Sequence, residues 1–280
     1  MFETITLRAA RTAAIALTAT ALAGAPLATQ AQTAPKADGW QTNLTLYGWF
    51  PGFSGSTNFP TGEGGPSINV NAENILENLK FTFMGTLDVH NGRWGVFNDV
   101  IYMNVGSNKS DTRDFSIGGG GVPASLTASV NYDLKTWVWT VAGEYRMISS
   151  PAYTMDVLAG ARMINLEQTL DYGFSGDLGN TGISGRTGSA SVSKTNWDAV
   201  VGVKGRYAFG DRREWFVPYY LDVGTGQSDL TWQGAIGLGY QFSWGAVSAL
   251  YRYLDYDFGT GGKVEDLSAS GPQIGVTFSF

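Results

Sequence analysis

Residues Leu230–Trp244 read LTWQGAIGLGYQFSW, and this stretch decides the class of fold. Its even-numbered positions are all apolar, aromatic or glycine, whereas its odd-numbered positions are all small or polar. Because successive side chains of a β-strand point to opposite faces, the stretch predicts a strand with one apolar and one polar face. Its aromatic residues gather at the two ends, which is typical of strands that cross a membrane between two aromatic girdles.

The end of the chain repeats this alternation, with Ile274, Val276, Phe278 and Phe280 separated by polar or small residues. A soluble β-sandwich would give the same pattern, with its apolar faces packed inward. Length separates the two folds, because segments of up to 15 residues exceed the usual five or six of a strand but suit a tilted membrane crossing. We therefore expect an all-β protein, an antiparallel up-and-down transmembrane β-barrel whose last strand turns Ile274, Val276 and Phe278 toward lipid.

Composition supports many strands and excludes several other classes. Glycine contributes 38 of 280 residues, about twice the usual share of roughly 7%, and aromatic residues make up 13%. There is no cysteine, so disulfides and thiolate metal sites are excluded. Without its first 31 residues the chain has 16 basic and 23 acidic residues, a net charge of −7 (16 − 23), which argues against binding to nucleic acid.

The first residues have the order of a secretory signal peptide. Arg8 and Arg11 precede an apolar stretch from Thr12 to Ala25, and Thr29–Ala31 supplies small or short residues. A retained transmembrane helix is the alternative, but about 14 apolar residues fall short of the roughly 20 that a bilayer requires. We predict a cleaved signal peptide over residues 1–31, a short periplasmic segment over 32–39, and the barrel over 40–280, located in the outer membrane of the cell.

The connections are of two kinds, as in outer-membrane barrels with short periplasmic turns and long outer loops. The short ones are Asn91–Arg93, Ser149–Tyr153, Gly210–Glu214 and Trp244–Gly245, and the long ones are Pro51–Leu79, Gly106–Ala124 and Tyr172–Lys194. With both barrel ends in the periplasm, this alternation gives ten strands. They cover about residues 40–50, 80–90, 94–106, 125–147, 154–171, 195–209, 215–226, 230–244, 246–257 and 264–280.

Some segments leave eight or twelve strands open. Asn98 and Asp99 fall on opposite faces of strand 94–106, so its lipid-facing side is not assigned. Pro218 lies inside strand 215–226, where it removes a ladder donor. Residues Ser67–Ala72 form either loop or a further strand, and Asn74–Leu79 either loop or a short helical turn.

The chain resembles a family of uncharacterised proteobacterial outer-membrane β-barrel proteins. The stretches that carry the resemblance are Tyr47–Gly52 (YGWFPG), Gly92–Phe97 (GRWGVF), Val201–Tyr207, Pro218–Gly224 (PYYLDVG) and Tyr251–Tyr256 (YRYLDY). More loosely, the chain is similar to the superfamily of small outer-membrane barrels and porins. The resemblance implies an outer-membrane location, and Phe280 resembles the C-terminal signal that the barrel-assembly machinery reads. It implies no reaction.

The inward faces of the predicted strands carry as many acidic as basic residues. They are Asp88, Glu144, Asp156, Asp198 and Asp222, and Arg146, Arg162, Lys204, Arg206 and Arg252. Charges in a narrow lumen must be paired or hydrated. Either these residues pair and fill the barrel, or they line a water-filled passage that selects small polar or charged solutes.

The sequence offers little catalytic chemistry. His90 is the only histidine. A catalytic histidine must be paired with a nucleophile or a carboxylate, and we expect His90 instead to be a polar residue at the periplasmic interface. We expect no enzyme activity, no cofactor and no metal. The first hypothesis is a narrow pore or uptake channel for small solutes, and the alternative is a structural or adhesive surface protein that acts through its outer loops. The partners expected are outer-membrane lipid and lipopolysaccharide and the barrel-assembly machinery; the oligomeric state is open.

Overall fold

The computed structural model describes residues 39–57, 67–107, 126–178, 181–260 and 264–280. The chain divides into residues 1–35 and a barrel unit, Lys36–Phe280, and only the barrel unit is treated below. The predicted signal peptide and nearly all of segment 32–39 therefore lie outside the described residues.

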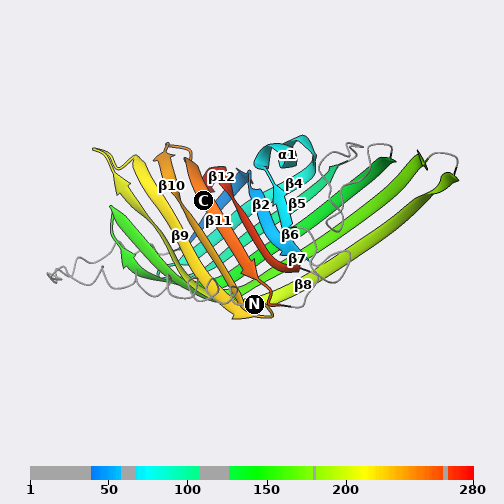
Figure 1. Ribbon diagram of the computed structural model, residues 1–280. Helices are drawn as coiled ribbons and strands as arrows, with labels where there is room; N and C mark the ends of the chain where they lie inside the picture. The colour runs from blue at the N-terminus through cyan, green and yellow to red at the C-terminus, as the bar shows by residue number, and fades with distance from the viewer. Residues whose placement is uncertain (1–38, 58–66, 108–125, 179–180, 261–263) are drawn as a thin grey trace, which may run out of the picture. The chain divides into compact units, whose positions relative to one another are not determined.

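Ten long antiparallel strands follow one another around a closed barrel (Figure 1). They are β1 (Trp40–Trp49), β4 (Leu79–Asn91), β5 (Trp94–Ser107), β6 (Leu126–Ser149), β7 (Tyr153–Leu178), β8 (Thr181–Phe209), β9 (Trp215–Gly226), β10 (Leu230–Gln241), β11 (Ala246–Asp257) and β12 (Val264–Ser279). The barrel closes where β1 pairs with β12, with Leu46 opposite Val276. The predicted ten-stranded up-and-down barrel is confirmed. Below, the end where Trp40 and Phe280 lie is called the terminal end and the opposite one the loop end.

The predicted loop Pro51–Leu79 contains regular structure, so that prediction was wrong in part. β2 (Gly52–Thr57) pairs with the first half of β12, so β1 and β2 together form one line of the wall, interrupted at Pro51, which has no N–H to donate. β3 (Ser67–Val70) pairs with β2, and α1 (Ala72–Glu77) follows. In the described part of the chain, no helix is long and apolar enough to cross a membrane.

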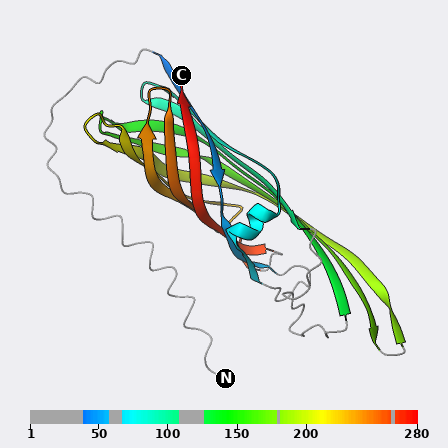
Figure 2. The same cartoon turned by 90° about the horizontal axis from the view of Figure 1, so that it is seen from above.

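The prediction of a loop over Tyr172–Lys194 was also wrong, because β7 and β8 continue through this segment as paired strands. They have 26 and 29 residues and pair as far as Leu178 opposite Thr181. β6 accompanies β7 to Leu126 opposite Gly176, and Figure 2 shows these three strands running beyond the rest of the barrel. The sequence hides this because a glycine at every third position from 173 to 188 breaks the two-residue alternation, while backbone pairing continues.

Pro218 is accommodated within β9, where the sequence left doubt. It lies opposite Arg206 of β8. On the other side, the pairing with β10 passes from Tyr219 opposite Ile236 to Phe216 opposite Gly239, so the ladder is interrupted where the proline lacks a donor.

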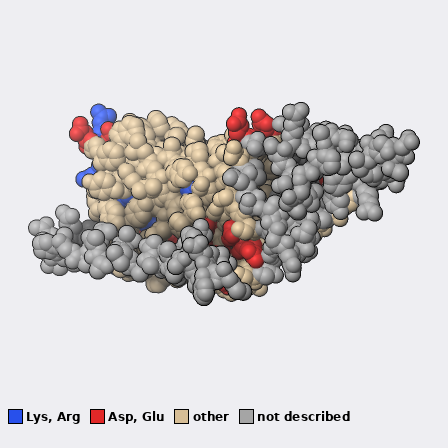
Figure 3. All heavy atoms as spheres, viewed as in Figure 1, with Lys and Arg blue, Asp and Glu red and all other residues tan. Residues whose placement is uncertain are grey.

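The outward face of the barrel is apolar. Exposed side chains on adjacent strands include Val201, Leu221, Ile236, Tyr251 and Ile274, and the described part of the wall in Figure 3 is nearly free of charged residues between its two ends. Aromatic side chains are exposed in two groups. Trp40, Trp94, Trp215, Trp244 and Phe280 lie at the terminal end, and Phe81, Phe83, Trp137 and Trp197 lie nearer the loop end.

The lumen is filled differently in its two halves. Toward the loop end it is an apolar core that includes Ile101, Met103, Val138, Ile164, Leu254 and Tyr256. A void lined by these side chains has a volume of only about 10 Å³, at the lower limit of what one water requires. Strand 94–106 could not be oriented from sequence because this half of its inward face is as apolar as its outward face. Toward the terminal end the lumen is charged.

Candidate functional site

Six ionisable side chains from four strands meet in the lumen near the terminal end. They are Asp88 and His90 of β4, Glu144 and Arg146 of β6, Asp156 of β7 and Lys204 of β8. Five of the six were among the inward charges predicted from sequence; His90 was not. We call this group the inner cluster.

His90 occupies the centre of the inner cluster and is only 2% exposed, so its predicted place at the membrane interface was wrong. Gly95 of β5 lies opposite both His90 and Glu144 in the strand register. A Cβ at Gly95 would lie 2.7 Å from His90 Nδ1 and 2.8 Å from Glu144 Oε1, closer than side chains can approach. The glycine therefore lets His90 and Glu144 meet across β5.

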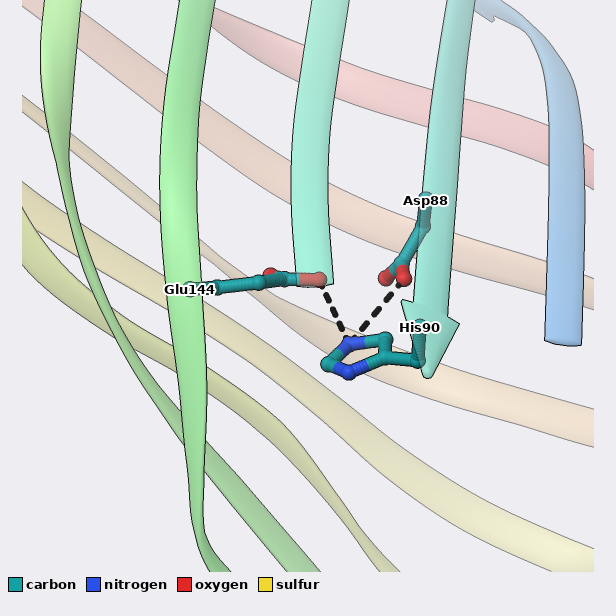
Figure 4. A group of neighbouring side chains, drawn as sticks. All are labelled: Asp88, His90 and Glu144. Atoms are coloured by element: carbon teal, nitrogen blue, oxygen red, sulfur yellow. Dashed lines mark ion pairs between the residues drawn. The ribbon is translucent and has the colours of Figure 1, made fainter. Parts of the chain in front are cut away.

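The imidazole of His90 is surrounded by carboxylates (Figure 4). Its Nε2 lies 2.5 Å from Glu144 Oε1, 3.2 Å from Asp88 Oδ1 and 3.6 Å from Asp156 Oδ2. One proton must lie between Nε2 and Glu144 Oε1, because two acceptor lone pairs would repel each other at 2.5 Å.

Two basic side chains neutralise the remaining charge of the inner cluster. Lys204 Nζ contacts Asp88 Oδ2 and lies 2.8 Å from Glu144 Oε2. Arg146 donates two hydrogen bonds to Asp156, of 2.8 and 3.0 Å, a bidentate geometry that favours strong pairing. Three carboxylates and two basic groups sum to −1 (−3 + 2), and a doubly protonated His90 would bring the sum to zero.

Asp88, His90 and Glu144 also place possible metal-ligand atoms within 4.8 Å of one another, the one group of this kind found among the described residues. Imidazole nitrogens and carboxylate oxygens are both ligand types that bind zinc. Here, however, the ammonium of Lys204 contacts both carboxylates, and a divalent cation between them would be repelled by it. The residues fit an ion-pair network better than a metal centre.

A second network crosses the middle of the lumen. Arg252 of β11 lies 2.6 Å from Asp99 Oδ2 of β5 and donates to the Tyr47 hydroxyl at 2.9 Å. Arg252 also donates to Gln233 at 2.8 Å. The guanidinium of Arg252 therefore occupies the lumen between β1, β5 and β10.

A third network is built around Arg162, whose side chain is fully buried. Its guanidinium contacts Asp222 of β9 and donates to the hydroxyls of Thr140, at 3.0 Å, and Thr231, at 3.4 Å. Asp222 also accepts a hydrogen bond from Tyr220.

The two other predicted interior charges make no ion pair among the described residues. Asp198 accepts a hydrogen bond of 2.7 Å from the backbone N–H of Ser228 and so fixes the turn between β9 and β10. Arg206 donates to Gln241 at 3.3 Å and lies over the ring of Phe216.

Sequence reasoning missed His90 and Asp99 as interior residues. The parity of strand 80–90 already placed His90 on the same face as Asp88, and that signal was sufficient. For Asp99, no signal within its own strand distinguishes the two faces. Its partners Tyr47 and Arg252 lie 52 and 153 residues away in sequence.

Comparison with protein-family models gives no match, and comparison with curated proteins gives none. Among solved structures, the chain is similar to the outer membrane protease OmpT from Escherichia coli (8% identity, TM-score 0.49, 89% of this chain and 99% of that chain). It is also similar to Ail, the attachment invasion locus protein of Yersinia pestis (12%, 0.32, 87% and 99%), and to the translocator domain of the autotransporter NalP from Neisseria meningitidis (12%, 0.32, 86% and 88%). At these identities and TM-scores no function follows for this chain.

Proposed function

We propose that the protein is an outer-membrane β-barrel with a closed lumen, and that it acts at the cell surface through the sheet that β6, β7 and β8 form beyond the barrel wall. The observation that carries the proposal is the length of β7 and β8, 26 and 29 residues. A membrane crossing needs only about 9–11 residues.

The spacing of the aromatic groups supports a membrane location. On β6, the outward-facing Trp137 and Tyr145 are eight residues apart (145 − 137), about 27 Å along a strand. At a tilt of about 40° this spans roughly 20 Å, close to the height of about 25 Å of the apolar band on membrane barrels. The terminal end, with its short turns, then faces the periplasm, and the loop end faces outward.

The packing of the lumen supports a closed barrel. Ile101, Ile164 and Tyr256 are each about 1% exposed, and Arg162 fills the layer below them. The interior of a membrane barrel of about eight strands is filled by side chains, whereas 16-stranded barrels leave a channel.

The sheet beyond the wall offers strand edges to a partner. Residues 181–197 of β8 pair with β7, and the pairing of β8 with β9 starts at Asp198. On the other side, residues 126–131 of β6 pair with β7, and the pairing with β5 starts at Tyr132. In the described part of the chain, both edges therefore have backbone groups that can pair with an extended polypeptide.

Shortening the sheet tests this proposal. Asp171 and Ser189 face each other, so residues 172–188 can be replaced by Asn-Gly, which favours a two-residue hairpin. Random linear peptides displayed on phage are selected on the full-length protein and on the shortened one. Enrichment on the full-length protein alone is expected. Equal enrichment on both, or none on either, would contradict the surface role.

The narrow-pore hypothesis remains as the second candidate, favoured by the polar walls of the half of the lumen near the terminal end. Conductance of the purified barrel in a planar bilayer separates the two. A closed lumen predicts no steady current at low voltage, and a steady current would contradict the packing argument.

A further inference from the structure

A cavity of about 270 Å³ lies in the mouth of the barrel at the terminal end, just beyond the inner cluster. Its walls come from the start of β1, the turn between β6 and β7, and the end of β8. The side chains that matter here are Gln41, Asn43, Arg146, Thr154 and Arg206. None of the nine residues that line the cavity is acidic.

Arg206 gives this cavity its charge. Arg146 is already paired with Asp156, but Arg206 forms no ion pair with any described residue. Among the described residues, its five N–H donors make one hydrogen bond, to the neutral amide of Gln241 at 3.3 Å. The stacking of its guanidinium on Phe216, 4.8 Å from the ring centroid, holds the flat side chain in place while its edge stays free. A planar guanidinium with free N–H groups matches the geometry of carboxylates and phosphates.

The neighbouring groups complete a polar lining for an oxyanion. The hydroxyl of Thr154 and the amides of Gln41 and Asn43 can donate hydrogen bonds, whereas the hydroxyl of Ser150 already donates to the carbonyl oxygen of Tyr153 at 3.0 Å. The adjacent inner cluster carries its own basic groups, so its carboxylates are largely neutralised and do not repel an anion strongly.

We propose that this cavity is a binding site for a small oxyanion, a phosphate or carboxylate group, that enters from the periplasmic side. The group belongs either to a free solute or to an anionic lipid headgroup. This anion site does not involve the sheet that β6, β7 and β8 form beyond the barrel wall. A negative result for anion binding would therefore leave the proposed surface role untouched, and the reverse also holds.

The test uses the full-length mature barrel, refolded in a zwitterionic detergent at low salt. Binding of inorganic phosphate and of succinate is measured by isothermal titration calorimetry, and retention of phosphatidylglycerol through detergent exchange is measured by native mass spectrometry. Arg206→Gln removes the free guanidinium, and it should weaken binding by about ten- to a hundred-fold, the range for one hydrogen bond to a charged group. Arg206→Lys keeps the charge without the planar fork and should recover part of the loss.

Arg212→Gln is the matched control, because Arg212 is an exposed arginine in the turn at the same end of the barrel and does not line the cavity. Its binding should equal that of the wild type. If Arg206→Gln does not refold, Thr154→Val removes a lining hydroxyl at constant shape and should also weaken binding. Binding that depends on Arg206 supports the site. If the soluble anions bind, the oxyanion group belongs to a free solute, and if only the lipid binds, it belongs to a lipid headgroup. No binding of any probe, or equal binding by wild type and Arg206→Gln, overturns it.

Discussion

Replacement of Arg162 by methionine should destabilise the barrel strongly. The guanidinium is fully buried, and its loss removes the hydrogen bonds to Thr140 and Thr231. It also leaves the carboxylate of Asp222 buried, with the Tyr220 hydroxyl as its remaining hydrogen-bond donor. Breaking a buried ion pair in this way costs about 3–5 kcal/mol, which lowers the folding equilibrium constant by a factor of about 150 to 5,000.

Removal of both charges should cost much less than removal of one. In Arg162→Met/Asp222→Leu no unpaired charge remains, and apolar replacement of a whole buried pair is often close to neutral. The double mutant should therefore be more stable than Arg162→Met alone.

Urea unfolding in lipid vesicles, followed by tryptophan fluorescence, measures the free energy of unfolding of the wild type, both single variants and the double variant. Arg212→Met, at an exposed turn, serves as the control and should stay within about 0.5 kcal/mol of the wild type. A cost of less than about 1 kcal/mol for Arg162→Met, or single effects that add within about 0.5 kcal/mol, would show that the two side chains are not coupled as a buried ion pair.

Two further predictions concern β12 and the residue that follows it, Phe280. Gly271→Val should destabilise the barrel by about 1–3 kcal/mol in the same urea assay, because a Cβ there would lie 2.1 Å from the backbone carbonyl oxygen of Phe50. Gly143→Ala is the control and should have little effect, because the nearest neighbour of its Cβ would lie at 4.0 Å. Equal losses of stability in the two variants would contradict the predicted clash at Gly271. Phe280 is 78% exposed, so Phe280→Ser should change the stability of the refolded barrel little but lower the amount assembled in the outer membrane of cells; undiminished assembly would refute its role as an assembly signal.

The outward face and the strand number could be predicted from sequence because each depends on local information. Ile236, Leu238 and Ile274 lie outward, as the alternation in their own strands requires. The short turns have well-defined signals, and both barrel ends on one side force an even number of strands. One boundary moved inward: β10 ends at Gln241 rather than Trp244, because the N–H of Phe242 donates to Gly245 O and closes the turn.

The contents of the lumen depend on contacts between distant strands, and local patterns do not encode them. Inward positions were expected to be polar, yet Ile101 and Met103 are inward and buried. The meeting of His90 with Glu144 requires the register of two strand pairs and a glycine between them. A glycine gives no sign in a single sequence of which two side chains it allows to meet.

The division of the lumen into an apolar and a charged half bears on function more than the number of charges does. A water-filled passage needs polar groups along its whole length, because each step of a solute through an apolar layer costs its hydration. Here, in the described structure, charged networks extend from the mouth near Arg206 to the layer of Arg162 and Arg252, and the packed apolar core with Ile101, Ile164 and Tyr256 follows them. A solute that enters at the terminal end therefore reaches a pocket that is closed at its inner end and has basic side chains in its wall. Such a geometry favours binding at the mouth of the terminal end over passage through the barrel.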